Sequence, residues 1–429
     1  MPHSGSGPGG FGKTAQAMSI DNDLKRDVRV ETGMRFGKNA PSLAEVKETA
    51  RQILEYKLKQ KRLQLDAGAK ETLLNAIGDD LLGFGPLEQL LRDNAITEIM
   101  INGPYRIYIE RAGKKNLSGI QFEDEGHLRS ILDKMLMLAG RRLDESSPYV
   151  DFSLKDGSRI NAIISPLAAD GSAITIRKFL DTLRSRDDLV RLKTINEPMS
   201  RFLQAAIKAK LNIMFAGATG AGKTATLNVL SNEIAPDERI VTIEDALELK
   251  LNQEHVVRLL TRGYNIEGKG AISVRQLFGN TLRMRPSRII LGEIRGEEAM
   301  DFLQAINSGH DGTLAVLHAS TPADVVGRLE TMAMYAGLNL PSSEIRRQIA
   351  SGLNLIIQHE QLADGSRKIT YITEVSGIKD GNIVLNDIFR FEITDHLETG
   401  EVIGEFKLVN QPANIARFKK RGIQLEQIF

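Results

Sequence analysis

The sequence predicts an α/β fold with a parallel β-sheet in the C-terminal part of the chain. Short apolar runs over residues 213–216, 240–243, 289–292 and 314–317 alternate with stretches of helical periodicity. Continuously apolar strands are typical of parallel sheets, because helices cover both of their faces. A glycine-rich segment, residues 217–224, follows the first of these strands. Ligands of such sheets bind at the carboxyl ends of the strands, so we expect a binding site there.

The glycine-rich segment has the pattern of a P-loop, which binds a nucleoside triphosphate. Its glycines let backbone N–H groups face phosphate oxygens, so ATP is the expected ligand. We expect Lys223 to reach the β- and γ-phosphates and the Thr224 hydroxyl to bind Mg²⁺. The residues expected to bind the nucleotide are Gly217, Ala218, Thr219, Gly220, Ala221, Gly222, Lys223, Thr224, Thr226 and His318.

A second match to the same pattern, residues 7–14, lies near the N-terminus. No strand precedes it, and the residues around it are rich in Gly, Ser and Pro, a composition typical of disorder. We therefore expect residues 1–40 to form a disordered arm and assign nucleotide binding to the later match alone.

The 56 Lys and Arg side chains nearly balance the 55 Asp and Glu side chains, leaving a net charge of +1. This balance argues against a general nucleic-acid binder, so we expect no direct contact with nucleic acid. The absence of cysteine excludes disulfides, thiolate metal sites and thiol nucleophiles. No apolar run approaches the length of a membrane span, and the first residues lack the apolar core of a signal peptide. We therefore expect a cytoplasmic protein.

A helical N-terminal subdomain is predicted over residues 41–82. Ser42 and Glu45 fit a capping box, and apolar residues recur at helical spacing from Leu43 onward. Turn-forming residues 83–86 end the helical pattern. The basic segment 57–62 is either a solvated helix face or a site for an anionic partner.

Residues 83–180 predict a small α+β domain, because short apolar strands alternate with Asn-Gly and Asp-Gly turns around one amphipathic helix. The next segment, residues 181–193, is rich in charges without a strong apolar face, which is typical of a linker. The nucleotide-binding domain then spans residues 194–429 and ends in hairpins.

Two acidic sites follow predicted strands beside the P-loop. Glu293 follows residues 289–292, and Glu244 follows residues 240–243. Phosphoryl transfer needs carboxylates that hold Mg²⁺ and polarise the attacking water, and Glu293 is a candidate for both roles. Acids at strand ends also cap turns or helices, so a structural role is the alternative for either one. Two such sites after one P-loop favour catalysis.

Arginines in residues 283–288 and Arg295 flank Glu293. Their guanidinium groups either stabilise charge on the transferring phosphoryl group or hold a carboxylate. His310 and His318 follow further along the chain. A zinc site is disfavoured because no third ligand is evident, which leaves phosphate sensing or local hydrogen bonding for these histidines.

Four segments in this order resemble the Walker A, Asp-box, Walker B and His-box series of the secretion and pilus ATPase superfamily. They are residues 217–224, 242–245, 282–296 and 308–319. Upstream, residues 140–145, 156–161 and 174–179 resemble the tight-adherence (Tad/Flp) pilus assembly ATPases of the CpaF type. The resemblance covers residues 82–391. It implies a RecA-like ATPase domain preceded by a small α+β (PAS-like) domain and a helical subdomain.

The resemblance further implies a homo-hexamer that hydrolyses ATP in a site closed by the N-terminal domain of the same or a neighbouring subunit. By the family pattern, Arg159 and Arg177 reach the phosphates from that domain. Glu293 is the Walker B acid and Glu244 the Asp-box acid, with the base and metal roles divided between them. Inner-membrane pilus platform proteins are the implied partners, which would place the protein peripherally at the inner face of the cytoplasmic membrane.

The leading hypothesis is therefore a motor ATPase that extends or retracts a pilus. One alternative is a conjugation, type IV secretion or DNA-uptake translocase, for which DNA-stimulated turnover with a steep salt dependence is the discriminating property. Another is a nucleotide-gated scaffold with negligible turnover, against which the intact Glu244 and Glu293 argue.

Overall fold

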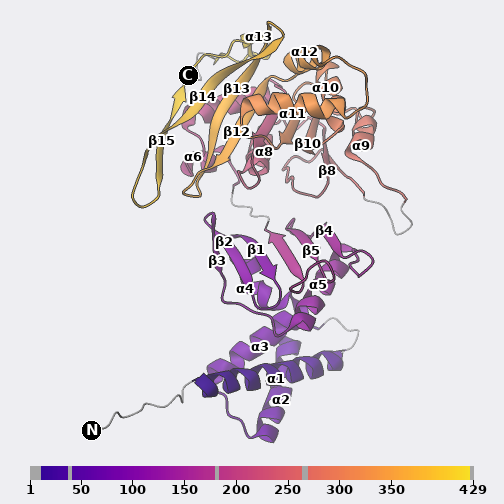
Figure 1. The fold of residues 1–429 in the computed structure, drawn as a ribbon, viewed down its shortest axis with the longest axis vertical. Helices are drawn as coiled ribbons and strands as arrows, with labels where there is room; N and C mark the ends of the chain where they lie inside the picture. The colour runs from indigo at the N-terminus through magenta and orange to yellow at the C-terminus, as the bar shows by residue number, and fades with distance from the viewer. Residues whose placement is uncertain (1–10, 37–40, 179–182, 263–268, 426–429) are drawn as a thin grey trace. The chain divides into compact units, whose positions relative to one another are not determined.

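The computed structural model describes residues 11–36, 41–178, 183–262 and 269–425. The chain divides into two compact units, residues 1–179 and 180–429, which are taken in turn (Figure 1). Among the helices that the structure describes, none is both long enough and apolar enough to cross a bilayer.

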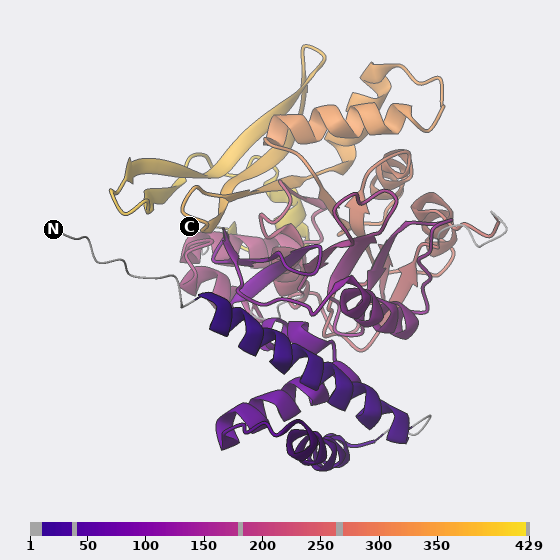
Figure 2. The same cartoon turned by 60° about the horizontal axis from the view of Figure 1, so that its bottom comes forward.

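The first unit begins with three helices, α1 (Phe11–Phe36), α2 (Leu43–Lys61) and α3 (Ala67–Leu82) (Figure 2). Ser42 and Glu45 form the expected capping box at the start of α2. Leu24 and Val28 of α1 are fully buried in a core shared with α2 and α3. The prediction of a disordered arm is therefore wrong for residues 23–36, because apolar side chains of this part of α1 pack against α2 and α3.

The rejected P-loop match at residues 7–14 falls partly outside the described residues, and its last four residues begin α1. The basic end of α2 is partly neutralised within this subdomain. Lys57 Nζ lies 3.1 Å from a carboxylate oxygen of Glu31, and Lys61 Nζ lies 3.2 Å from Asp27. These ion pairs with α1 favour the solvated-face interpretation of the basic segment.

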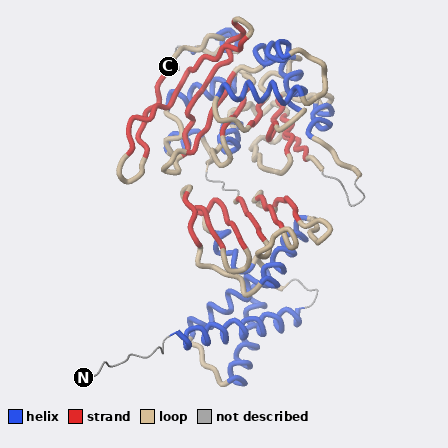
Figure 3. Tube along the Cα trace, in the orientation of Figure 1, coloured by secondary structure: helices blue, strands red, loops and turns tan. Residues whose placement is uncertain are grey.

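The α+β domain follows and has a six-stranded antiparallel sheet in the order β3-β2-β1-β6-β5-β4. One long helix, α5, shares a core with alternate residues of the strands (Figure 3). Among the residues described in the first unit, no helix covers the other face of the sheet. Its elements are η1 (Gly85–Leu87), α4 (Glu88–Arg92), β1 (Ile96–Asn102), β2 (Ile107–Arg111), β3 (Lys114–Leu117), α5 (Glu125–Ala139), β4 (Tyr149–Ser153), β5 (Arg159–Ile163) and β6 (Ala173–Arg177).

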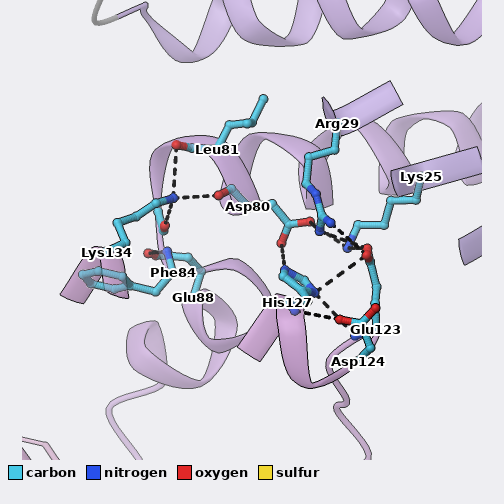
Figure 4. Close-up of polar contacts among 11 residues, drawn as sticks. Lys25, Arg29, Asp80, Leu81, Phe84, Glu88, Glu123, Asp124, His127 and Lys134 are labelled. Carbon is cyan, nitrogen blue, oxygen red and sulfur yellow. Dashed lines mark hydrogen bonds and ion pairs between the residues drawn. The ribbon is translucent and has the colours of Figure 1, made fainter. Parts of the chain in front are cut away.

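A buried polar cluster joins the helical subdomain to this domain (Figure 4). The side chain of Asp80, on α3, is 1% exposed and accepts ion pairs from two cations of α1, Lys25 at 2.9 Å and Arg29 at 3.1 Å. Both cations also pair with Glu123, at 3.4 and 3.0 Å. His127 of α5 places Nε2 3.3 Å from the other oxygen of Asp80. Charges from α1, from α3 and from the segment that precedes α5 therefore neutralise one another inside the first unit.

Lys134 of α5 secures the end of α3 beside this cluster. Its ammonium donates to the carbonyls of Asp80, Leu81 and Gly83 at 2.7, 3.2 and 2.9 Å. The last carbonyls of a helix have no partner within the helix, so a cation there satisfies them. Burial lowers the pKa of Lys134.

The second unit is a nine-stranded mixed sheet in the order β15-β14-β13-β12-β7-β11-β10-β8-β9. Strands from β12 to β9 are parallel, and the apolar runs predicted four of them, β7, β8, β10 and β11. The run at residues 355–357 was expected only in a hairpin, and β9 was not predicted. Strands β12 to β15 form antiparallel hairpins that extend the same sheet. The strands are β7 (Ile213–Gly217), β8 (Ile240–Glu244), β9 (Val256–Leu260), β10 (Arg288–Ile294), β11 (Leu314–Leu317), β12 (Leu355–Gln361), β13 (Arg367–Lys379), β14 (Asn382–His396) and β15 (Val402–Leu408).

Helices cover both faces of this sheet, and each face has its own apolar core. One core includes residues of α7, α8 and α13, and the other includes residues of α9 to α12. The helices are α6 (Arg186–Arg191), α7 (Glu197–Lys208), α8 (Lys223–Ser231), α9 (Val274–Thr281), α10 (Glu298–Asn307), α11 (Pro322–Met334), α12 (Ser342–Gly352) and α13 (Ile415–Lys420).

Part of the predicted linker belongs to this unit. Residues 186–191 form α6, which a capping box between Ser185 and Asp188 starts. Leu189 is fully buried in the core of the second unit. A linker is therefore the wrong assignment for α6, because Leu189 is buried in the core and Arg186 pairs with Glu233 at 2.7 Å. Residues 181 and 182 lie outside the described residues.

Candidate nucleotide site

The P-loop connects β7 to α8 and depends on its glycines. Gly217, Gly220 and Gly222 have φ angles of +148°, +79° and +98°, a region that side chains with a Cβ rarely adopt. A Cβ at Gly217 would also lie 2.4 Å from the carbonyl oxygen of His359 on the neighbouring strand β12. The loop is therefore bent by local backbone geometry and pressed against an adjacent strand.

Lys223, the first residue of α8, turns its side chain into the loop. Its Nζ donates to the carbonyl oxygens of Gly217 at 2.9 Å and Ala218 at 2.7 Å. The same atom lies 3.4 Å from Nδ1 of His318. A cation held in a glycine-rich loop at the N-terminus of a helix is suited to phosphate oxygens.

The next residue brings a hydroxyl and a carboxylate together. Thr224 Oγ1 lies 3.4 Å from Oε2 of Glu248, which follows β8. Magnesium prefers oxygen ligands and takes one or two from protein, with the rest from water and substrate phosphates. Thr224 and one nearby acid supply the few protein ligands that a phosphate-bound Mg²⁺ takes. Among the described residues, no group of three or more His, Asp or Glu side chains could hold a metal ion.

The remaining residues of the predicted loop differ in their exposure. Ala218 and Thr219 are exposed at the mouth of the loop, whereas Ala221 is buried. Thr226 is 2% exposed within α8, and its backbone N–H donates to the carbonyl of Gly222 at 2.9 Å. The side chain of Thr226 thus lies in the protein interior.

Glu293, the second-last residue of β10, is the centre of a charged cluster. Its carboxylate accepts from Arg295 Nη2 at 2.6 Å and lies 3.1 Å from His318 Nε2. Burial acts to raise the pKa of Glu293, but the contacts with His318 and Arg295 outweigh it and lower this pKa to about 2. Because His318 also faces Lys223, one histidine joins Glu293 to the P-loop lysine.

Glu244, at the end of β8, has the opposite environment. It is 2% exposed, and its Oε1 accepts from the backbone N–H groups of Glu248 and Leu249 at 2.9 and 2.8 Å. Burial raises the pKa of Glu244 to about 7 despite these two hydrogen bonds. A Cβ at Gly292 would lie 3.1 Å from Cγ of Glu244, so the glycine on β10 leaves room for this side chain.

The two acids therefore differ in protonation near neutral pH. A carboxyl group whose pKa lies near 7 can accept a proton and release it again, which suits a general base. A carboxylate that stays ionised, as Glu293 does, suits a metal ion or a cation. The structure thus separates two residues that the sequence could not tell apart.

The arginines around Glu293 have separate roles. Arg288 is buried and pairs with Glu238 through two contacts, at 2.8 and 3.1 Å, so it is structural. Arg295 instead bonds to Glu293. This carboxylate raises the pKa of Arg295, although burial acts to lower it. His310 lies 3.3 Å from the Ser308 hydroxyl, a local contact outside the charged cluster.

Arg159 and Arg177 lie in the first unit, whereas the P-loop lies in the second. They are paired directly across β5 and β6, and Arg177 Nε lies 3.6 Å from a carboxylate oxygen of Glu98. Both alternate along their strands with the buried Ile160 and Ile176, so they lie on the sheet face opposite α5. Strand alternation therefore presents the two arginines together.

A pocket of about 510 Å³ opens beside the P-loop. It is lined by residues from the end of β7, the end of β11 and the first turns of α11: Gly217, Ala218, His318, Ala319, Ser320, Ala323, Asp324, Gly327 and Arg328. His318 thus lies where the charged cluster meets open space.

Three residues near the loop were missed by sequence reasoning. Glu248 lies beside Thr224, and the signal for it was a third acid shortly after Glu244. Arg367 Nε donates to the carbonyl of Gly220 at 2.7 Å, and His359 is buried against Gly217. Burial lowers the pKa of His359 to about 4. No local pattern marks the last two, because the pairing of β12 with β7 brings them to the loop.

A family model described as "Type II/IV secretion system protein" matches residues 80–374. The chain belongs to this family of secretion ATPases. The fold is accordingly a RecA-like P-loop domain preceded by a smaller α+β domain. This membership confirms the resemblance to the secretion and pilus ATPase superfamily, which the sequence analysis drew from four segments.

The match to this chain covers most of the length of two relatives. The chain is 33% identical over 313 residues to a Mycobacterium tuberculosis protein named for conjugal transfer, covering 71% of this chain and 88% of the relative. It is 31% identical over 319 residues to the type IV secretion system protein VirB11 of Brucella suis, covering 68% and 88%.

Two solved structures are also similar to this secretion ATPase. The VirB11 ATPase of Brucella suis matches with 28% identity and a TM-score of 0.37, covering 67% of this chain and 91% of that one. The pilus retraction motor PilT matches with 16% identity and a TM-score of 0.46, covering 79% and 86%.

Proposed function

We propose that this secretion ATPase hydrolyses ATP to ADP and phosphate and couples the reaction to mechanical work on a Tad/Flp-type pilus. The observation that carries the hydrolysis is the difference between two acids beside one P-loop. Burial raises the pKa of Glu244 to about 7. Burial also acts to raise the pKa of Glu293, but the contacts with His318 and Arg295 outweigh it and lower this pKa to about 2.

In this proposal the residues divide the chemistry among themselves. Lys223 and the loop N–H groups bind the β- and γ-phosphates. Thr224, which has Glu248 beside it, and Glu293 would hold the magnesium, and the ion would supply positive charge at those phosphates. Glu244 accepts a proton from the attacking water. His318 lies between Glu293 and Lys223 and is positioned to respond to the γ-phosphate.

We further propose a homo-hexamer in which Arg159 and Arg177 complete each ATP site. The two arginines share one open sheet face, and a guanidinium pair suits the charge of a transferring phosphoryl group. Mixing subunits tests this arrangement. If the arginines act on a neighbouring subunit, Arg177→Ala subunits mixed with Lys223→Ala subunits recover turnover, and a lack of recovery at every ratio contradicts it.

The pilus assignment rests on the upstream strings that resemble Tad/Flp assembly ATPases, residues 140–145, 156–161 and 174–179. A pilus motor acts on inner-membrane platform proteins, so we propose a peripheral position at the inner face of the cytoplasmic membrane. Counting surface pili in cells that lack this protein tests the assignment, and unchanged pili refute it.

Conjugation or type IV secretion is the second candidate, because the names of several relatives refer to those processes. A DNA translocase would show turnover that DNA stimulates and that salt suppresses steeply. Turnover of the purified protein with and without DNA, at two salt concentrations, separates the candidates. The pilus proposal predicts no stimulation by DNA.

A further inference from the structure

Arg367, the first residue of β13, touches the P-loop from a distant part of the chain. Its Nε donates to the carbonyl oxygen of Gly220 at 2.7 Å, across 147 positions in sequence. A Cβ built on Gly222 would lie 3.4 Å from Cδ of Arg367, which is ordinary van der Waals contact. The arginine side chain therefore lies along the loop from Gly220 to Gly222.

This contact fixes the orientation of one peptide group. A trans peptide is planar, so its carbonyl and its N–H point in opposite directions. Because Arg367 holds the Gly220 carbonyl on one side, the N–H of Ala221 points to the other, where it donates to Ala218 O at 3.3 Å. The Lys223 ammonium donates to the same oxygen at 2.7 Å. Both donors are thus directed to one point inside the loop.

The peptide that Arg367 holds joins Gly220 to Ala221, so a glycine stands on one side of it. Gly220 and Gly222 both have positive φ, and glycine crosses between backbone regions more easily than any other residue. A loop with free peptides would lose entropy each time it bound phosphate. An external hydrogen bond to the carbonyl reduces that cost in advance.

The support for Arg367 is itself well anchored. The turn between β12 and β13 is closed by a hydrogen bond from Leu362 N to Ser366 O at 2.8 Å. Asp364 in this turn accepts from the backbone N–H of Val402 at 3.0 Å, and Leu362 packs with Phe391 and Val402. The β14–β15 hairpin therefore holds the turn that carries Arg367.

From this geometry we propose that Arg367 is a positioning residue that holds the P-loop in its phosphate-binding conformation and links it to the C-terminal hairpins. The inference rests on the proposed binding of ATP by this loop. Arg367 acts through the loop backbone, so its loss weakens binding of the phosphates more than it slows the chemical step.

The test compares Arg367→Ala with Arg367→Lys and with a control, Arg390→Ala. Arg390 is an arginine of the adjoining strand β14 that bonds to Asp387 instead of the P-loop. For Arg367→Ala we expect the KM for ATP to rise about tenfold, as for the loss of a charged hydrogen bond, while kcat changes less than about threefold. The lysine variant keeps a cation and should recover part of the loss, and the control should keep the wild-type KM.

Hydrogen exchange of the loop amides, measured without nucleotide, gives a second readout. Exchange across residues 217–224 should accelerate about tenfold in Arg367→Ala and remain unchanged in Arg390→Ala. Wild-type KM and wild-type exchange in Arg367→Ala would overturn the proposal, as would an equal effect of the control. If the wild-type protein neither binds nor hydrolyses ATP, the proposed function fails, and the exchange experiment still decides the role of Arg367.

Discussion

Replacing Asp80 with Asn is expected to loosen α1 from the first unit. Asp80 is the buried anion that two cations of α1, Lys25 and Arg29, contact directly. Asparagine has nearly the same volume, so the substitution removes the charge while leaving the packing in place. The remaining acid, Glu123, is then the only carboxylate among those described that pairs with both cations.

The pKa of Asp80 gives the magnitude. Burial acts to raise this pKa, but the neighbouring His127 and Lys25 outweigh burial and lower it from 3.8 to about 2. Lowering the pKa of a carboxyl group from 3.8 to about 2 corresponds to about 2–3 kcal/mol of stabilisation. Since the folded pKa lies below the unfolded one, this stabilisation is complete above about pH 4 and is lost as the pH falls toward 2.

Hydrogen exchange over residues 23–36 is the assay, because these residues form the described contacts of α1. At pH 7 the Asp80→Asn variant should exchange faster than the wild type in this segment, by at most about 50-fold, the equivalent of about 2–3 kcal/mol. This is an upper limit because His127, which contributes most to lowering the pKa, belongs to α5 and not to α1. The control is Asp79→Asn, whose carboxylate forms a largely exposed pair with Arg92 at 3.2 Å. A surface pair contributes about 0–1 kcal/mol, so the control should change little. Equal exchange in both variants, or none above wild type, would refute the buried-anion account.

Three other substitutions test the site and its support. Glu244 must lose its proton before it can accept one from water, so kcat of the wild type should rise with pH through about 7. Glu244→Gln should lower kcat by about 10²–10⁴ and abolish that rise. A rise that persists in the variant would exclude Glu244 as the base. Glu293→Gln should lower turnover equally at pH 6 and pH 9, because a pKa of about 2 leaves this acid ionised throughout, and a pH-dependent loss would contradict that ionisation. Gly312→Ala places a Cβ 2.1 Å from Arg288 Nη1. The control is Gly309→Ala, because Gly309 also has a positive φ but has open space around it. Gly312→Ala should lower the free energy of unfolding by about 1–3 kcal/mol more than the control does, and thermal unfolding of the two variants measures this difference.

Local patterns predicted much of the second unit. The P-loop directly follows β7 in the sequence, and Glu244 and Glu293 each lie at the end of their own strand. Periodicity and motif spacing could therefore locate them. Helix α1 was missed because the glycine-rich first residues dominated the composition of the segment that contains Leu24 and Val28. Helix α6 was missed because one buried leucine, Leu189, gives no periodic signal.

The electrostatic roles depended on contacts that no local pattern encodes. Glu244 and Glu293 each follow an apolar strand, and only burial beside Gly292 and the approach of His318 and Arg295 separate their pKa values. Arg367 reaches Gly220 because β12 pairs with β7 and turns back into β13. The hexamer and the roles of Arg159 and Arg177 stay predictions.

The most direct test of the central claim is ATP turnover of purified Lys223→Ala. Lys223 is buried in the loop and donates to two of its carbonyls, so it is the cation placed to bind the phosphates. The account predicts that turnover falls by about 100-fold or more, whereas Lys208→Ala, which removes an exposed lysine at the end of α7, keeps wild-type turnover. Turnover of Lys223→Ala close to that of the wild type would contradict the assignment of this loop as the hydrolysis site.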